Sequence, residues 1–226
     1  MNNAFSFSGK GNVLAVGAHP DDIELGCGGT LGLLKKMGHP INLLVLTKGE
    51  ASGDARIREI ESIKSSKILE AENIRFGDIK DTMVRPDITA ISVIEEQIDK
   101  LRPALIFTCF VGDTHQDHRN TGLATISAGR RSQAIVMYES PTSVGMRPTL
   151  FVDVSKTIQL KKKLLEVYVT QRNKDWMEAQ AFMAYAKFRG FQSGFPVAEA
   201  FEVAKIAISD GAVKDSRIPK AYQEKI

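Results

Sequence analysis

Short, uninterrupted apolar runs alternate along the chain with longer stretches in which apolar and polar residues mix. The runs are typical of strands buried on both faces of a sheet, at 13–16, 41–47, 104–109 and 134–137, with shorter strands at 73–76 and 149–154. The mixed stretches predict helices from about 31, then at 55–71, 88–101, 120–130, 157–168 and 175–188. Alternating strands and helices predict an α/β fold, because right-handed crossovers place the helices over a parallel sheet.

The expected fold is therefore Rossmann-like, with a mostly parallel sheet and helices on both faces. We expect the helix at 55–71 to begin after Asp54 and to turn its isoleucines toward the sheet, namely Ile57, Ile60, Ile63 and Ile68. Asn120 is a good cap for the predicted helix at 120–130. The segment 197–208 is expected to continue a helical tail. Residues 1–226 fit one domain, with a loose lead-in at 1–11 and a tail from about 210.

Two polar clusters follow predicted strands. His19-Pro20-Asp21-Asp22 comes directly after the first strand, and the segment 113–118 (DTHQDH) follows the strand at 104–109. Because parallel strands end at one edge of a sheet, we expect both clusters to meet in one crevice. Of the four histidines, His39 lies outside the clusters in a turn, where we expect it to be exposed.

Composition narrows the class of protein. The chain of 226 residues is 43% hydrophobic and 25% charged with a net charge of +3, as in an ordinary globular protein. It has neither an aromatic-lined basic stretch for nucleic acid nor an apolar run that could span a bilayer. The lysines at 161–163 are expected to form the solvated face of a helix. Cys27 and Cys109 are not spaced as a metal-binding pair and indicate buried thiols in the cytoplasm.

The clusters have a simple alternative interpretation, since Asp21 and Asp22 could cap the following helix. The three histidines beside them favour a metal site instead. Two imidazoles and one carboxylate suit Zn²⁺ and leave a coordination position for water, as catalytic sites require. Iron(II) accepts the same set, so the donors leave the metal open. A dinucleotide site at Gly26-Cys27-Gly28-Gly29 is disfavoured, because the order of glycines is wrong and acidic residues stand where a pyrophosphate would lie.

The segments 18–31 (AHPDDIELGCGGTL) and 114–121 (THQDHRNT) resemble the PIG-L/LmbE-like family of zinc-dependent N-deacetylases. The resemblance covers about residues 12–205 and implies removal of acetyl from N-acetylglucosamine-type amino sugars. It implies that His19, Asp22 and His118 bind the metal and that Asp21 is the general base. The spacing alone would also allow the two aspartates to have the reverse roles.

The same resemblance implies a catalytic role for His115, which would stabilise the oxyanion or protonate the leaving amine. The alternative is a histidine that only supports the metal ligands. Asp117 is counted with the catalytic group and, with Asp113, is expected to orient imidazoles by hydrogen bonding. Glu24 is expected to hold the loop.

Three residues are candidates for the substrate site by the same resemblance, namely Glu50, Arg58 and Asp81. The alternative for Arg58 is a surface ion pair with Glu61, three residues on. Val197 stands where the family has a tyrosine, so a different substrate pocket is expected. The expected partner is a small amino-sugar conjugate, and the sequence leaves a homo-oligomer open. The alternatives are a metal amidohydrolase of the same fold on a non-sugar substrate and a weakly catalytic metal-binding protein.

Overall fold

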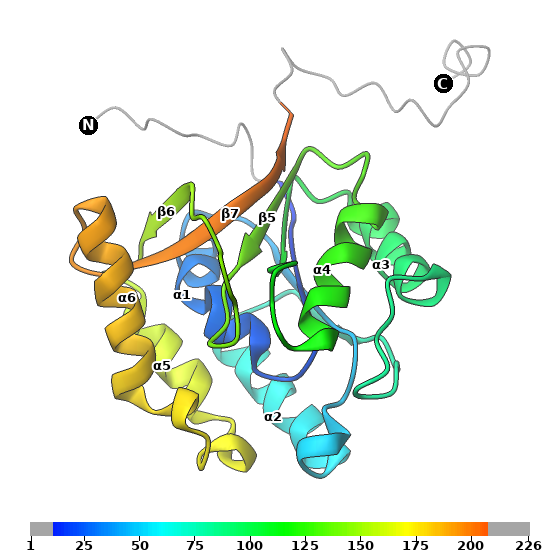
Figure 1. Cartoon of the computed structure of the whole chain (residues 1–226), viewed down its shortest axis with the longest axis horizontal. Helices are drawn as coiled ribbons and strands as arrows, with labels where there is room; N and C mark the ends of the chain where they lie inside the picture. The colour runs from blue at the N-terminus through cyan, green and yellow to red at the C-terminus, as the bar shows by residue number, and fades with distance from the viewer. Residues whose placement is uncertain (1–10, 208–226) are drawn as a thin grey trace.

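A seven-stranded sheet forms the centre of the computed structural model, which describes residues 11–207 (Figure 1). Its strand order is β3-β2-β1-β4-β5-β7-β6, and within the described residues β7 is the one strand that runs opposite to the other six. The strands are β1 (Val13–Gly17), β2 (Ile41–Val45), β3 (Asn73–Phe76), β4 (Leu105–Cys109), β5 (Ala134–Tyr138), β6 (Leu150–Asp153) and β7 (Ala198–Ile206).

Helices cover both faces of this sheet. They are α1 (Asp22–Lys36), α2 (Ala55–Ile68), α3 (Ile88–Leu101), α4 (Gln116–Ala128), α5 (Ile158–Glu166) and α6 (Ala179–Ser193), with short 3₁₀ turns at Glu50–Ser52, Val169–Gln171 and Asp175–Met177. In β1, Val13 and Ala15 join the core beneath α1 and α5, whereas Leu14 and Val16 join the core beneath α3 and α4. The predicted mostly parallel α/β sheet with helices on both faces is confirmed.

The site is positioned by the place of β1 in the sheet. From β1 the chain crosses to β2 on one side, and later returns to form β4 on the other side. The crossovers therefore diverge at the carboxyl ends of these two strands, which is where open α/β sheets usually bind their ligands. Both predicted polar clusters lie at these ends, in the turn after β1 and in the loop after β4.

The segment expected to continue the helical tail forms β7 instead. It pairs with β5 on one side and β6 on the other, although its sequence is rich in alanine and glutamate. Burial between two strands outweighs helix propensity here, since propensities are small beside tertiary packing. The expected lead-in and the tail from about 210 lie almost wholly outside the described residues, so the structure leaves those predictions untested.

The predicted inner face of α2 is wrong. Ile57 and Ile60 are 50% exposed and Ile68 is 41% exposed, with Ile63 half-buried. The buried face carries Arg58 and Glu61 instead. These polar side chains can be buried because each meets specific partners: the Glu61 carboxylate accepts bonds from the amide and the hydroxyl of Thr170, at 2.9 and 2.6 Å. Asp54 does cap the helix, as predicted.

Three smaller predictions are also corrected. Helix α4 begins at Gln116, where Nδ1 of His115 caps it by accepting a bond from the amide of Asp117, and Asn120 lies inside the helix with its side chain bonded to the carbonyl of Val84. His39 is buried, with Nδ1 3.1 Å from the carbonyl oxygen of Gly11. Lys161 is buried in an ion pair with Glu199 at 2.7 Å, so this lysine does not belong to a solvated face. Among the described residues, no helix is long and apolar enough to cross a membrane.

Candidate metal and catalytic site

The turn after β1 holds its side chains in a strained backbone. Asp21 adopts φ 99°, in the left-handed region that residues with a side chain rarely occupy. Asp22 begins α1, and its Oδ2 accepts bonds from the amides of Ala18 and His19 at 3.0 and 2.8 Å. Such strain is found where the surrounding structure holds a conformation that function requires.

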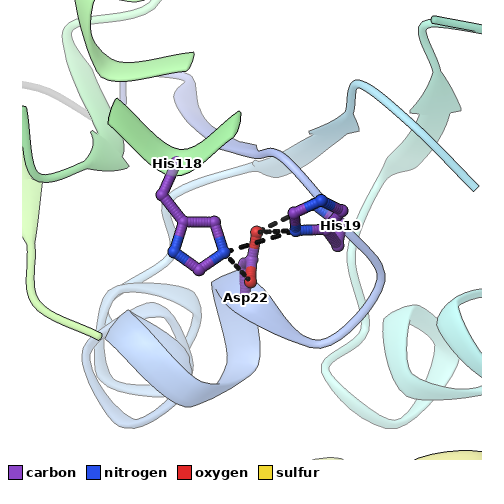
Figure 2. Close-up of side chains that lie close together, drawn as sticks. All are labelled: His19, Asp22 and His118. Atoms are coloured by element: carbon purple, nitrogen blue, oxygen red, sulfur yellow. Dashed lines mark hydrogen bonds and ion pairs between the residues drawn. The ribbon is translucent and has the colours of Figure 1, made fainter. Parts of the chain in front are cut away.

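Two histidines and one aspartate point their polar atoms at a common position (Figure 2). Nδ1 of His19 lies 3.3 Å from Nε2 of His118, and 3.4 Å from Oδ2 of Asp22. Nε2 of His118 lies 3.2 Å from Oδ1 of Asp22. The three side chains are those predicted to bind the metal, and they come from the turn after β1, the first residue of α1 and the first turn of α4.

The spacing of these atoms fits a small tetrahedral cation. Nitrogen and oxygen ligands at ~2.0–2.1 Å from Zn²⁺ lie about 3.3 Å from one another in a tetrahedron. The two imidazole nitrogens are 3.3 Å apart, which agrees with that value, and each lies 3.2–3.4 Å from one of the two carboxylate oxygens of Asp22. Two nitrogens facing each other without an ion between them would compete for one proton, so the donor set fits a divalent metal.

Each imidazole is held from its other nitrogen by a carboxylate. Nε2 of His19 lies 3.0 Å from Asp81 and 3.2 Å from Asp117, and Nδ1 of His118 lies 3.2 Å from Asp113. A proton on these nitrogens leaves the opposite lone pairs free for a metal, the usual arrangement around ligating histidines. His19, Asp81 and Asp117 also converge closely enough to form a second set of potential ligands.

The pKa values of the cluster show how strongly its charges interact. Burial lowers the pKa of His118, but the charge of Asp22 and hydrogen bonds to Asp113 and Asp22 outweigh burial and raise it to about 10. For His19 too, burial is outweighed by hydrogen bonds to Asp117, Asp22 and Asp81, and the pKa lies well above its usual value. A bound cation would replace those protons, because metal ligands must be deprotonated.

Asp21 lies beside the cluster and is held by Arg58. The guanidinium donates from Nη2 to Asp21 Oδ2 at 3.1 Å and to the carbonyl of Pro20 at 2.7 Å, and from Nη1 to the carbonyl of Gly49 at 2.8 Å. Glycine suits position 49, since its φ of 67° is one that other residues rarely adopt and a Cβ would displace Nη1 of Arg58, 1.9 Å away. Burial raises the pKa of Asp21 to about 7, against the opposing charge of Arg58. Such a pKa suits a general base near neutral pH.

His115 stacks on His118, with ring centroids 4.5 Å apart and an angle of 19° between the planes. Its Nδ1 accepts a hydrogen bond from the amide of Asp117 at 3.2 Å, which places the proton of the neutral ring on Nε2. Burial and the positive charges of His118 and His19 lower its pKa. The result is a neutral imidazole beside the candidate metal position, with one N–H to donate.

The three predicted substrate residues lie in different environments. Glu50 is exposed, although one of its oxygens accepts a bond from the amide of Asp81 at 2.9 Å. Arg58 and Asp81 are buried, and their charged groups face Asp21 and His19. Of the two carboxylates, that of Glu50 is the more accessible to a ligand. The Asp21 contact also replaces the surface ion pair considered for Arg58.

Two residues that hold Asp113, Ser140 and Thr142, were not predicted from the sequence. The hydroxyls of Ser140 and Thr142 donate to its carboxylate, with the Thr142 bond at 2.7 Å. These bonds and the one to His118 keep the pKa of Asp113 below its usual value despite burial. A usable signal was present, because this serine and threonine follow a buried strand that ends at the same sheet edge. Glu24 is structural as predicted, accepting a bond from the hydroxyl of Tyr168 at 2.7 Å.

The chain belongs to the PIG-L family of deacetylases. Residues 14–129 match this family, described as GlcNAc-PI de-N-acetylase, and this range contains every metal and catalytic candidate. The sequence is 34% identical over 154 residues to the uncharacterized deacetylase YaiS of Escherichia coli K12, covering 64% of this chain and 82% of that protein. It is 28% identical over 221 residues to a diacetylchitobiose deacetylase of Thermococcus kodakarensis, covering 85% and 83% of the two chains.

The fold also occurs in an enzyme of another class. The structure of 4-carboxy-2-hydroxymuconate hydratase from Pseudomonas putida KT2440 superposes with a TM-score of 0.78 at 18% identity, covering 90% of this chain and 100% of that one. At this identity the similarity concerns the fold alone. The reaction must therefore be argued from the site.

Proposed function

We propose that this protein is a zinc-dependent N-deacetylase that removes the acetyl group from an N-acetylglucosamine-type amino sugar or its conjugate. The observation that carries the proposal is the set of separations of 3.2–3.4 Å among His19, Asp22 and His118, with Asp21 directly beside them. Membership of the PIG-L family supports the reaction. The name of the diacetylchitobiose deacetylase relative supports the sugar.

His19, Asp22 and His118 would hold the ion, with Asp81, Asp117 and Asp113 fixing the two rings. When bound, zinc supplies Lewis-acid chemistry, polarising the acetamide carbonyl and acidifying water. Iron(II) would suit the same donors, and the choice of zinc rests on the family.

Asp21 would accept the proton of the attacking water on its carboxylate. Arg58 bonds one oxygen of that carboxylate, and the pKa of about 7 keeps the base partly deprotonated at neutral pH. His115 would donate a hydrogen bond from Nε2 to the developing oxyanion, and the proton that Asp21 has accepted from water would pass to the nitrogen of the leaving amine as the C–N bond breaks. The neutral state of His115 suits donation of a hydrogen bond without repelling the cation. Glu50, exposed at the end of the same edge, is the candidate to accept a bond from a sugar hydroxyl.

A metal-loaded activity screen over N-acetylglucosamine derivatives, with free amine as the readout, tests this proposal. Release of amine from the wild-type enzyme, lost on chelation and restored by zinc, is the expected result. If acylated amino acids react while no N-acetyl sugar does, the sugar assignment fails. The absence of any turnover with a bound ion would favour a metal-binding protein with little catalysis.

A second candidate is a hydrolase of the same site that acts on a non-sugar N-acyl substrate. It is favoured by Val197, which stands where the family has a tyrosine, and which is buried, with no hydroxyl to offer a sugar. A cytoplasmic location stays a prediction, and both cysteines are buried free thiols.

A further inference from the structure

A cavity of about 320 Å³ lies between α6, β7, α1 and the residues that follow β5. Its wall is largely apolar, formed among others by Leu25, Pro141, Phe182, Ala186, Ala198 and Ala200. The volume is at the lower end of the ~300–1,000 Å³ typical of ligand pockets. It would hold roughly ten water-sized groups. Small residues create this space, since several positions of the wall carry only a methyl group.

The charged residues of the wall neutralise one another. Lys161 pairs with Glu199 at 2.7 Å, and Glu199 also accepts bonds from the amides of Gly29 and Thr30 at 3.0 and 2.6 Å. On the opposite side, Nε of Arg189 donates to Glu139 at 2.8 Å. The remaining charged residue of the wall, Asp175, is exposed, which places it at the opening. A polar ligand would leave its own groups unpaired against the apolar wall, at a cost in free energy.

The cavity adjoins the candidate metal site at two places. Ser140 belongs to its wall and donates to Asp113, which bonds His118. Leu25 also belongs to the wall, and its amide bonds the carbonyl of Asp21, one turn earlier in α1. Both connections reach residues assigned to the metal or to the base. Ser140 is thus shared by the cavity wall and the contacts that reach His118, which places the cavity next to the candidate metal position on the side of Ser140.

We propose that this cavity receives a neutral, apolar aglycone, an aryl group or a short alkyl chain attached to the N-acetyl amino sugar. The inference rests on the proposed function and narrows its substrate class. A phenyl or hexyl group fits within this volume, and both cations of the described wall, Lys161 and Arg189, are already paired with carboxylates, which disfavours an aglycone that carries a carboxylate. Burial of each methylene strengthens binding roughly fourfold.

Two leucine variants on α6 test the assignment. Ala186 is buried and lines the cavity, whereas Ala184 is exposed on the same helix. The ratio of kcat/KM for the hexyl and methyl β-glycosides of N-acetylglucosamine is measured for each protein. We expect the wild type and Ala184→Leu to prefer the hexyl glycoside by at least ~10-fold. In Ala186→Leu the preference should fall by ~10-fold, because leucine occupies the space of about two methylenes or more.

Equal ratios in the wild type and Ala186→Leu would overturn the inference while leaving the proposed function intact. Should Ala186→Leu fail to fold, Ala181→Leu fills another part of the wall and is read against the same control. If no N-acetylglucosaminide is deacetylated, the proposed function fails. Calorimetry with hexyl β-glucoside then tests separately whether the cavity binds an apolar aglycone. Binding at least ~10-fold weaker in Ala186→Leu than in Ala184→Leu would support the cavity. Equal binding, or none, would refute it.

Discussion

The guanidinium of Arg58 lies 3.1 Å from the carboxylate of Asp21, across the boundary between α2 and the turn that precedes α1. Both residues are buried, and Asp21 stands in a strained backbone conformation that the arginine helps to hold. Arg58 also bonds the carbonyls of Pro20 and Gly49, so it joins the loops after β1 and β2. The arginine thus acts on the base and on the shape of the crevice together.

Replacing Arg58 by Gln should move the acidic limb of kcat/KM to higher pH. The arginine opposes the rise that burial causes in the pKa of Asp21, so its loss lets that pKa rise above about 7. The base must be deprotonated, and activity therefore falls at a higher pH than in the wild type, by about one unit or more. Arg56→Gln, on the exposed side of α2, is the control and should leave the limb in place. If the acidic limb of kcat/KM lies at the same pH in Arg58→Gln as in the wild type, this arginine does not lower the pKa of Asp21.

Asp21→Asn should lower kcat by ~10²–10⁴-fold while metal content stays near that of the wild type. The amide keeps the shape of the side chain but cannot accept a proton. Asp22→Asn should instead lose the ion, because a neutral amide is a poor ligand. Elemental analysis and steady-state kinetics on both variants separate the two roles. Loss of metal from Asp21→Asn, with metal retained in Asp22→Asn, would mean that the two aspartates have the reverse roles.

His118→Ala should abolish binding of one divalent ion per chain and all activity. The ring supplies one of three converging donor atoms, and Asp22 would lose the partner that lies 3.2 Å away. His39→Ala is the matched control, because His39 is buried outside the site and bonds Gly11. Metal per chain is measured after dialysis. Full occupancy in His118→Ala would rule out this ligand set.

Asp81→Asn should weaken metal binding by ~10–100-fold without removing a ligand. The carboxylate lies 3.0 Å from Nε2 of His19 and favours the tautomer whose Nδ1 is free for the ion. The dissociation constant for Zn²⁺ is measured by competition with a chelating dye. Asp78→Asn, at an exposed position nearby, should bind metal as the wild type does. If Asp81→Asn binds Zn²⁺ with unchanged affinity but has a raised KM, Asp81 contacts the sugar, as the family resemblance implied.

Lys161→Met should lower the free energy of unfolding by about 3 kcal/mol, because it leaves Glu199 buried without its cation. Lys162→Met removes a neighbouring lysine whose side chain is 44% exposed and whose partner Glu166 lies 3.8 Å away. That control should cost less than about 1 kcal/mol, as exposed ion pairs do. Urea unfolding of both variants gives the comparison. Equal losses would show that burial of the Lys161–Glu199 pair is not important for stability.

The sequence by itself determined the central part of the fold and the two polar clusters that the site contains, whereas the choice of metal ligands within them came from the family resemblance. Four apolar runs that are too short to be helices predicted the strands β1, β2, β4 and β5. Such runs are typical of strands that are buried on both faces of a sheet. The order of strands and helices then required a mostly parallel sheet. Parallel strands end at one edge, so topology alone predicted that the cluster after β1 and the cluster after β4 would meet.

The tertiary structure alone decided how the side chains around that cluster are used. Nothing in the spacing of Arg58 shows whether it faces solvent, a sugar or Asp21, since the face that α2 buries depends on polar partners distant in sequence. The same holds for β7, whose helix-favouring residues form a strand because β5 and β6 satisfy its backbone. The pattern of apolar and polar residues in a segment shows which secondary structure that segment prefers. The hydrogen-bond and packing partners that outweigh this preference come from distant parts of the folded chain.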